Sequence, residues 1–162
     1  MISQCQFQDK KNYNMIKINT YSPDDIATEE IKNEIINFLF ESLEQYGDPK
    51  ADIEKCMDYA FGQNNKPGGM VLSAIDSDSQ KIVGAVITNK TGMDGYIPEN
   101  ILVYIATDKN MRGKGVGKQL MQTAINLSDG DMALHCEPDN PAKFLYEKLG
   151  FSSKYLEMRL KK

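Results

Sequence analysis

The residues whose types and spacing best suit chemistry form one segment, 112–117, which reads Arg-Gly-Lys-Gly-Val-Gly. Glycine has no Cβ, so three glycines at alternate positions let the backbone curl and approach a ligand closely. A helical pattern follows, with Val116, Leu120, Ala124 and Leu127 on one face. The unpaired N–H groups and the positive dipole end of a starting helix attract anions. The segment therefore predicts a phosphate or pyrophosphate site.

Three glycine-loop patterns compete for this segment, and a plain helix cap is a fourth interpretation. A Walker loop fails, because Gly113 to Gly117 is one residue too short and Gln119 replaces the required hydroxyl. A dinucleotide fingerprint fails on its last glycine spacing. Arg112, Gly115 and Gly117 instead match Arg/Gln-x-x-Gly-x-Gly/Ala. In this form the chain resembles the GCN5-related N-acetyltransferase (GNAT) superfamily, whose loop wraps the pyrophosphate of acetyl-CoA.

A second segment supports the same resemblance. Residues 137–151 read Glu-Pro-Asp-Asn-Pro-Ala-Lys-Phe-Leu-Tyr-Glu-Lys-Leu-Gly-Phe, similar to the Asn, Ala, Leu-Tyr, Lys-x-Gly-Phe segment of the superfamily. Both segments lie in the family order. One departure concerns Asn140, which precedes Tyr146 by six residues where seven is usual, so that Asp139 falls on the expected position.

The resemblance implies a set of residues that bind acetyl-CoA. The pantetheine arm is expected to pair with a strand edge, where an N–H near Ile105 could also polarise the thioester carbonyl. The loop N–H groups are expected to hold the pyrophosphate, and an asparagine is expected to contact the cofactor. In this sequence these positions are Ile105, Ala106, Thr107, Arg112, Gly113, Lys114, Gly115, Val116, Gly117, Lys118, Asn140 and Tyr146.

The implied reaction also needs proton transfer. An alkyl ammonium has a pKa of about 10 and must lose a proton before it attacks. Glu99, at the start of the central strand, is the candidate general base, with a plain surface carboxylate beside Pro98 as the alternative. Tyr146 stands at the position of the family's general acid, with structural packing as the alternative. Tyr104 is expected in the core or a pocket wall.

Hydrophobic periodicity predicts the elements that must position these residues. The expected fold is α/β (α+β), GNAT-like, with a mixed, mostly antiparallel sheet of six to seven strands and about four helices, in the order β-α-α-β-β-β-α-β-α-β. One domain is expected to span residues 1–162, with 1–13 loosely ordered. Strands are predicted at 15–21, 70–75, 81–88, 101–106, 132–136 and 155–160, and helices at 26–46, 52–61, 116–127 and 142–149.

Composition limits the classes of protein to which the chain could belong. The 162 residues are 41% hydrophobic and 26% charged, with a net charge of −4. Neither a membrane span nor a signal peptide is indicated, so the protein is expected in the cytoplasm. An acidic chain does not suit nucleic acid. The cysteines, Cys5, Cys56 and Cys136, show neither disulfide nor zinc spacing, and no metal site is expected. His135 and Cys136 should point to opposite strand faces, which argues against a nucleophilic pair.

Negative charge is concentrated between residues 21 and 60, where eleven acidic residues face three basic ones. Two interpretations stay open: a solvated helix face, or a rim that attracts a cationic amine. The end of the chain differs from the family, because the twelve residues after Gly150 are short for two final strands. A truncated hairpin or a homodimer completing that edge is expected.

Together these observations predict an acetyl-CoA-dependent N-acetyltransferase acting on a primary amine of a small molecule or peptide. Direct attack in a ternary complex is the expected mechanism. A non-catalytic acetyl-CoA sensor and another nucleotide-phosphate binder are the alternatives. The sequence does not identify the acceptor amine or the length of the acyl group.

Overall fold

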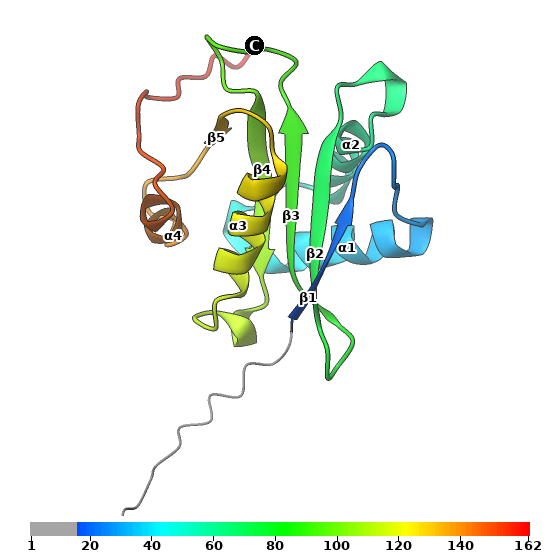
Figure 1. Cartoon of the computed structure of the whole chain (residues 1–162). Coiled ribbons are helices and arrows are strands. Elements are labelled where there is room, and N and C mark those ends of the chain that lie inside the picture. Colours follow the sequence, from blue (N-terminus) through cyan, green and yellow to red (C-terminus); the bar gives the residue numbers. More distant parts are fainter. Residues whose placement is uncertain (1–15) are drawn as a thin grey trace, which may run out of the picture.

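The computed structural model describes residues 16–162, and the predicted loose terminus at 1–13 lies outside them. A five-stranded sheet lies between two pairs of helices (Figure 1). The elements are β1 Ile16–Tyr21, α1 Glu29–Ser42, α2 Lys50–Ala60, β2 Gly69–Asp76, β3 Ile82–Lys90, β4 Asn100–Thr107, α3 Val116–Leu127, β5 Met132–Leu134 and α4 Lys143–Lys148. Short 3-10 turns occur at η1 Glu44–Tyr46, η2 Gln63–Asn65 and η3 Lys109–Met111.

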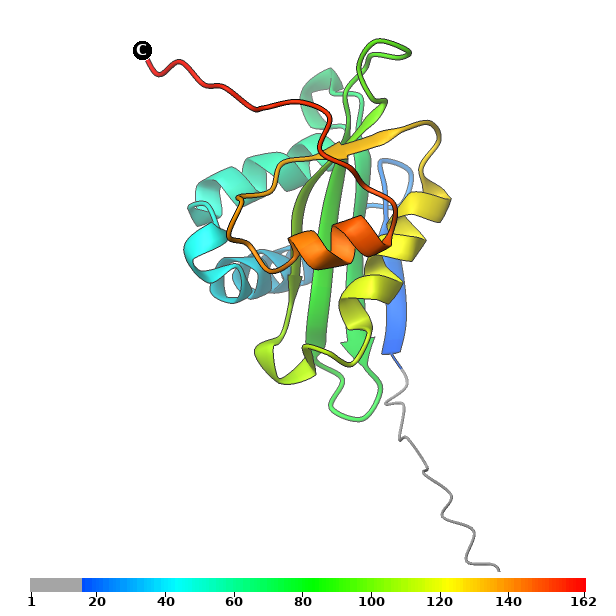
Figure 2. The same ribbon diagram turned by 90° about the vertical axis from the view of Figure 1, so that its left-hand side faces the viewer.

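The sheet has the strand order β1-β2-β3-β4-β5. The first four strands run antiparallel, and β5 is parallel to β4. Helices α1 and α2 cover one face, and α3 and α4 lie on the other (Figures 1 and 2). Since both faces of the sheet are covered, β2 and β3 are almost continuously buried, as expected for strands between two helical layers.

The two helical layers have separate hydrophobic cores. Under α1 and α2, the fully buried side chains include Ile35, Leu39 and Met57. Under α3, Leu120 and Met121 are equally buried. Fully buried residues recur four positions apart in each helix, at Ile35 and Leu39 in α1, Ile53 and Met57 in α2, and Leu120 and Ala124 in α3, so single faces of these helices meet the sheet.

A β-bulge in β4 changes which side chains meet each layer. Ile87 pairs with Tyr104 and Thr88 pairs with Leu102, so Val103 is an extra residue in β4. Residues two apart in a regular strand share a face. Here Leu102 packs in the α3 layer, whereas Tyr104 packs in the α1–α2 layer. The bulge therefore turns the second half of β4 over relative to the first.

Gly84 lets α3 approach the sheet closely. A Cβ at this position would lie 2.6 Å from Leu120 Cδ1 and 3.0 Å from Val116 Cγ1. Both atoms belong to fully buried side chains on the first two turns of α3. The missing side chain on β3 thus sets how near the start of α3 lies to the strands.

The predicted fold class is confirmed, and the strand count is the main correction. The sheet has five strands rather than six to seven, and the predicted strand at 155–160 is absent from the described chain. Figure 2 shows this segment running from α4 as an extended coil. Its apolar side chains are 78–90% exposed, so no neighbouring strand buries them: Tyr155, Leu156, Met158 and Leu160. Whether a second chain covers them stays a prediction.

Two predicted elements also end early. The helix predicted at 26–46 stops at Ser42, because Glu44 adopts a left-handed backbone with φ 53° and begins the η1 turn. The strand predicted to reach Cys136 ends at Leu134. The helix predicted at 116–127 has those bounds in the structure.

The packing of α3 leads to a stability prediction. Leu120→Ala should lower the free energy of unfolding by about 2–5 kcal/mol, because Leu120 is 0% exposed and its loss leaves a cavity. Leu127→Ala is the matched control on the same helix, since that side chain is 53% exposed, and it should change stability by less than about 0.5 kcal/mol. Urea unfolding measures both, and equal losses would contradict the assigned packing of α3.

Candidate active site

The loop before α3 presents unpaired backbone N–H groups. Gly115 is the N-cap of α3 and has a φ of 86°, which a residue with a side chain rarely adopts. It supplies no side-chain acceptor to the first helical turn. Within residues 16–162, backbone N–H groups without an intramolecular acceptor follow one another along this turn, at Gly113, Gly115, Val116, Gly117 and Lys118. These groups and the helix dipole suit an anion.

The space in front of this loop is open. A Cβ added to Gly113 or Gly115 would meet no protein atom within 4 Å. The side chains of Arg112, Lys114 and Lys118 are exposed around it. A phosphate-bearing group can therefore reach the loop backbone without displacing protein atoms.

The edge of β4 beside the loop has no partner strand. Strand β5 pairs with β4 only at Asn100, Ile101 and Leu102, and within the described chain nothing pairs with β4 on that side after the bulge. This free part, residues 103–107, contains all three predicted arm-binding residues and is called the open edge below: Ile105, Ala106 and Thr107. Its unpaired backbone groups can hydrogen-bond an extended ligand as a strand would.

Gly117 brings three elements together at this place. A Cβ on Gly117 would lie 3.3 Å from Thr107 Oγ1 at the end of β4 and 3.4 Å from Leu145 Cδ2 on α4. The glycine loop, the open edge and α4 thus border one another. The structure places the predicted loop and strand residues side by side.

Tyr146 lies on α4, next to Leu145. The residue is 6% exposed, and its ring meets Phe151 edge to face with 6.1 Å between centroids. Burial, with a smaller effect of Cys136, raises the pKa of the Tyr146 phenol to about 12. Its hydroxyl forms no hydrogen bond within the described chain and is not fully enclosed. The phenol is therefore protonated at neutral pH and free to donate.

Asn140 has a structural hydrogen bond. Its Oδ1 accepts from the backbone N–H of Ala142 at 2.9 Å and shapes the turn that leads into α4. The side-chain amide nitrogen is left for any contact with a ligand. The free thiol of Cys136 does not suggest a nucleophile, because burial raises its pKa.

Glu99 lies at the other end of β4 from the glycine loop. Its carboxylate accepts from the backbone N–H of Asp131 at 2.6 Å and of Gly95 at 3.4 Å. These bonds hold the pKa of Glu99 below its usual value. The residue borders a depression of about 240 Å³ that Met93 also lines. The structure does not join Glu99 to the loop, and its role as a base stays a prediction.

The segment between α1 and α2, residues 43–49, is called the α1–α2 connection below. The sequence did not predict that this segment borders the candidate site. It contacts the open edge itself and two segments beside it. Glu44 pairs with Arg112 of the loop at 3.6 Å, and the Tyr46 hydroxyl donates to the Asp139 carbonyl at 3.4 Å. The Tyr104 hydroxyl donates to Asp48 Oδ2 at 2.6 Å. These contacts join residues 56 to 93 positions apart, so the local sequence carries no sign of them beyond the excess of acid.

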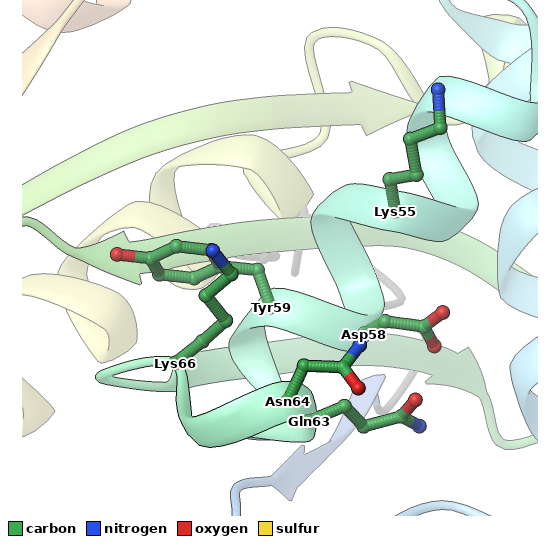
Figure 3. A pocket seen from close by; sticks show the side chains of 6 residues that line it. All are labelled: Lys55, Asp58, Tyr59, Gln63, Asn64 and Lys66. Atoms are coloured by element: carbon green, nitrogen blue, oxygen red, sulfur yellow. The ribbon is translucent and has the colours of Figure 1, made fainter.

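A second depression, of about 320 Å³, lies on the outer side of α2 and η2 (Figure 3). Figure 3 shows Tyr59 and Lys66 together on one side and Asp58 on the other. Asp58 is paired with the buried Lys32 at 2.7 Å. No residue predicted from the sequence to act in a site lines this depression, which belongs to the α2 surface.

Residues 16–162 contain neither a metal-binding cluster nor a membrane-spanning helix. No group of three or more His, Cys, Asp or Glu side chains in that range could hold a metal ion. In the same range, every helix is too short or too polar to cross a membrane.

The fold and site define a class: an α/β protein with an anion-binding loop beside an open strand edge. A family model described as the acetyltransferase (GNAT) domain matches residues 67–153, just over half of the chain. The chain therefore belongs to the GNAT acetyltransferase family, and the resemblance stated from the motifs is confirmed. No curated protein sequence matches it.

Solved structures share the fold at low sequence identity. An aminoglycoside acetyltransferase from an uncultured soil metagenomic sample, in complex with sisomicin, is 19% identical with a TM-score of 0.60, covering 92% of this chain and 96% of that one. A ribosomal-protein-alanine N-acetyltransferase from Brucella melitensis is 18% identical with a TM-score of 0.61, covering 91% and 99%. A Corynebacterium glutamicum structure described as histone acetyltransferase HPA2 and related acetyltransferase is 20% identical with a TM-score of 0.60, covering 88% and 89%.

The hydrogen bonds to Glu99 predict a pH-dependent effect on stability. A carboxylate whose pKa is lowered by folding adds stability above its unfolded pKa, about 4.3, and loses it as the pH falls through the folded value. Glu99→Gln should therefore unfold at lower urea concentration than the wild type at pH 7, and the difference should shrink below about pH 4.

The control for this comparison is Glu34→Gln. Glu34 is exposed and forms no hydrogen bond or ion pair among the described side chains. The Glu34→Gln variant should unfold at the same urea concentration as the wild type, both at pH 7 and below about pH 4. A Glu99→Gln difference that stays constant or grows on acidification would show that the two N–H contacts do not stabilise the ionised form.

Proposed function

We propose that this protein transfers the acetyl group of acetyl-CoA to a primary amine of a small molecule or peptide, by direct attack in a ternary complex. The observation that carries the proposal is the juxtaposition of the unpaired loop N–H groups with the open edge of β4. Family membership makes acetyl transfer the chemistry to test, since enzymes of this family use acetyl-CoA as co-substrate.

The loop and the open edge have separate tasks in the proposed complex. The N–H groups of Gly113, Gly115, Val116, Gly117 and Lys118 would bind the pyrophosphate, aided by the exposed side chains of Arg112 and Lys114. The backbone of Ile105 to Thr107 would hydrogen-bond the pantetheine arm. Asn140 would contribute only its amide nitrogen, because its oxygen is already bonded to Ala142. Bound acetyl-CoA supplies the activated acetyl thioester.

Transfer requires one proton to leave the amine and one to reach the departing sulfur. Tyr146 supports the second task, because its buried phenol stays protonated and its hydroxyl has no intramolecular partner in the described chain. An N–H of the open edge near Ile105 would stabilise negative charge on the thioester oxygen. Glu99, directly or through water, is the proposed acceptor of the amine proton.

The Gly115→Glu substitution tests whether the loop binds the phosphates of acetyl-CoA. Gly115→Glu should weaken acetyl-CoA binding at least about fivefold, because a second negative charge a few ångströms from a phosphate costs roughly 1 to 4 kcal/mol. Calorimetric titration of acetyl-CoA measures the affinity. Gly62→Glu is the matched control, since Gly62 also has a left-handed backbone, with φ 72°, but lies after α2. Equal affinities of the two variants would reject the loop assignment.

Tyr146→Phe tests the acid. The variant should lose about 10²-fold or more in kcat while its affinity for acetyl-CoA stays within about twofold, because only the proton donor is removed. Thiol release with an amine found by screening gives kcat. Unchanged turnover would make Tyr146 a packing residue, and acetyl-CoA binding without turnover of any amine would favour the sensor.

A further inference from the structure

One carboxylate near the open edge differs from its acidic neighbours. Within residues 44–58, Glu44 pairs with Arg112, Asp52 with Lys55, and Glu54 and Asp58 with Lys32. Asp48 is the one acidic residue of this segment without an ion pair in the described chain. Its carboxylate therefore has no directly contacting cation in the described chain.

Two basic side chains near Asp48, Lys50 in sequence and Arg159 in space, are bonded to other partners. Lys50, two residues along, donates to Asn37 Oδ1 at 2.7 Å and lies over the Phe40 ring. Arg159 of the C-terminal segment is near enough for Asp48 to contribute to its raised pKa, but its guanidinium is bonded to Glu157 at 2.6 Å. Both cations leave the Asp48 carboxylate accessible.

Tyr104 fixes the position of this carboxylate. Its hydroxyl donates to Asp48 Oδ2 at 2.6 Å, while the tyrosine itself is only 7% exposed. Tyr104 is the first residue after the bulge at Val103, where β4 loses its pairing with β5. Asp48 is thus held at the start of the open edge with one oxygen, Oδ1, free to accept.

The hydrogen bonding and the position of Asp48 differ from those of Glu99. Both Glu99 oxygens accept from backbone N–H groups, at the end of β4 that is still paired with β5. The free oxygen of Asp48 lies beside Tyr104, in the part of β4 along which the proposed acetyl donor would bind. It can receive a cation without breaking an existing bond.

We infer that Asp48, oriented by Tyr104, binds the ammonium group of a cationic alkylamine acceptor and so determines which amines the protein accepts. The inference rests on the proposed function and names the substrate class of that same site. An ammonium donor and an ionised carboxylate form a charge-assisted hydrogen bond, which is stronger than a bond between neutral groups. Neutral amines would gain little from this contact.

The test measures binding of 1,4-diaminobutane to the full chain saturated with CoA, by calorimetry at low salt. Asp48→Asn should weaken diamine binding at least tenfold, because it keeps an acceptor for Tyr104 but removes the charge. Tyr104→Phe should weaken it less, since the charge remains and only its orientation is lost. CoA affinity and melting temperature should stay at wild-type values in Asp48→Asn.

The matched control is Asp52→Asn, which removes an equal charge four residues away from a carboxylate paired with Lys55 at 3.0 Å. It should leave diamine affinity within twofold of the wild type. Equal losses of diamine affinity in the two variants would show a general charge effect and overturn the inference. A wild-type protein that binds CoA but not the diamine would also overturn it. Absence of CoA binding would instead overturn the proposed function itself.

Discussion

The rest of the site depends on the interruption of pairing between β4 and β5. Strand β5 follows β4 for three residues only, and the extra residue Val103 turns the remainder of β4 over. Backbone N–H and C=O groups that lose a partner strand must find water or a ligand. The bulge thus has two consequences: it leaves residues 103–107 free to bind an extended molecule, and it sends Tyr104 into the α1–α2 layer, where its hydroxyl reaches Asp48.

The glycine loop depends on this arrangement through packing. Because Gly84 on β3 has no side chain, Leu120 and Val116 of α3 can pack close to the sheet. Because Gly117 has none, the start of α3 can lie against Thr107 at the end of β4 and Leu145 of α4. A helix terminus binds anions only where its N–H groups face a ligand. Here the tight contacts hold those groups next to the open edge. The proposed phosphate site and the proposed arm site therefore belong to one packed unit.

Local sequence was sufficient for the parts of the site that local forces create. The period of α3 and the glycines before it predicted both the helix bounds and the unpaired N–H groups. The α1–α2 connection could not be predicted in this way, because Asp48 meets a residue 56 positions away. The alternation at 155–160 suggested a strand, yet alternation forms a strand only where a neighbouring edge accepts it, and these side chains stay exposed.

Some of the acidic residues between residues 21 and 60 have identifiable partners, of two kinds. Lys32 is 5% exposed and is held between α1 and α2 by Asp58 at 2.7 Å and Glu54 at 3.5 Å, so part of the acid compensates a buried cation. Other carboxylates pair at the surface, where such contacts add little stability. Asp48, like Glu34, has no ion pair in the described chain, but unlike Glu34 it is oriented by the Tyr104 hydroxyl. A carboxylate oriented by a buried phenol and lacking a cation is an incomplete ion pair, and its position at the open edge means that an incoming cationic amine would complete it beside the thioester.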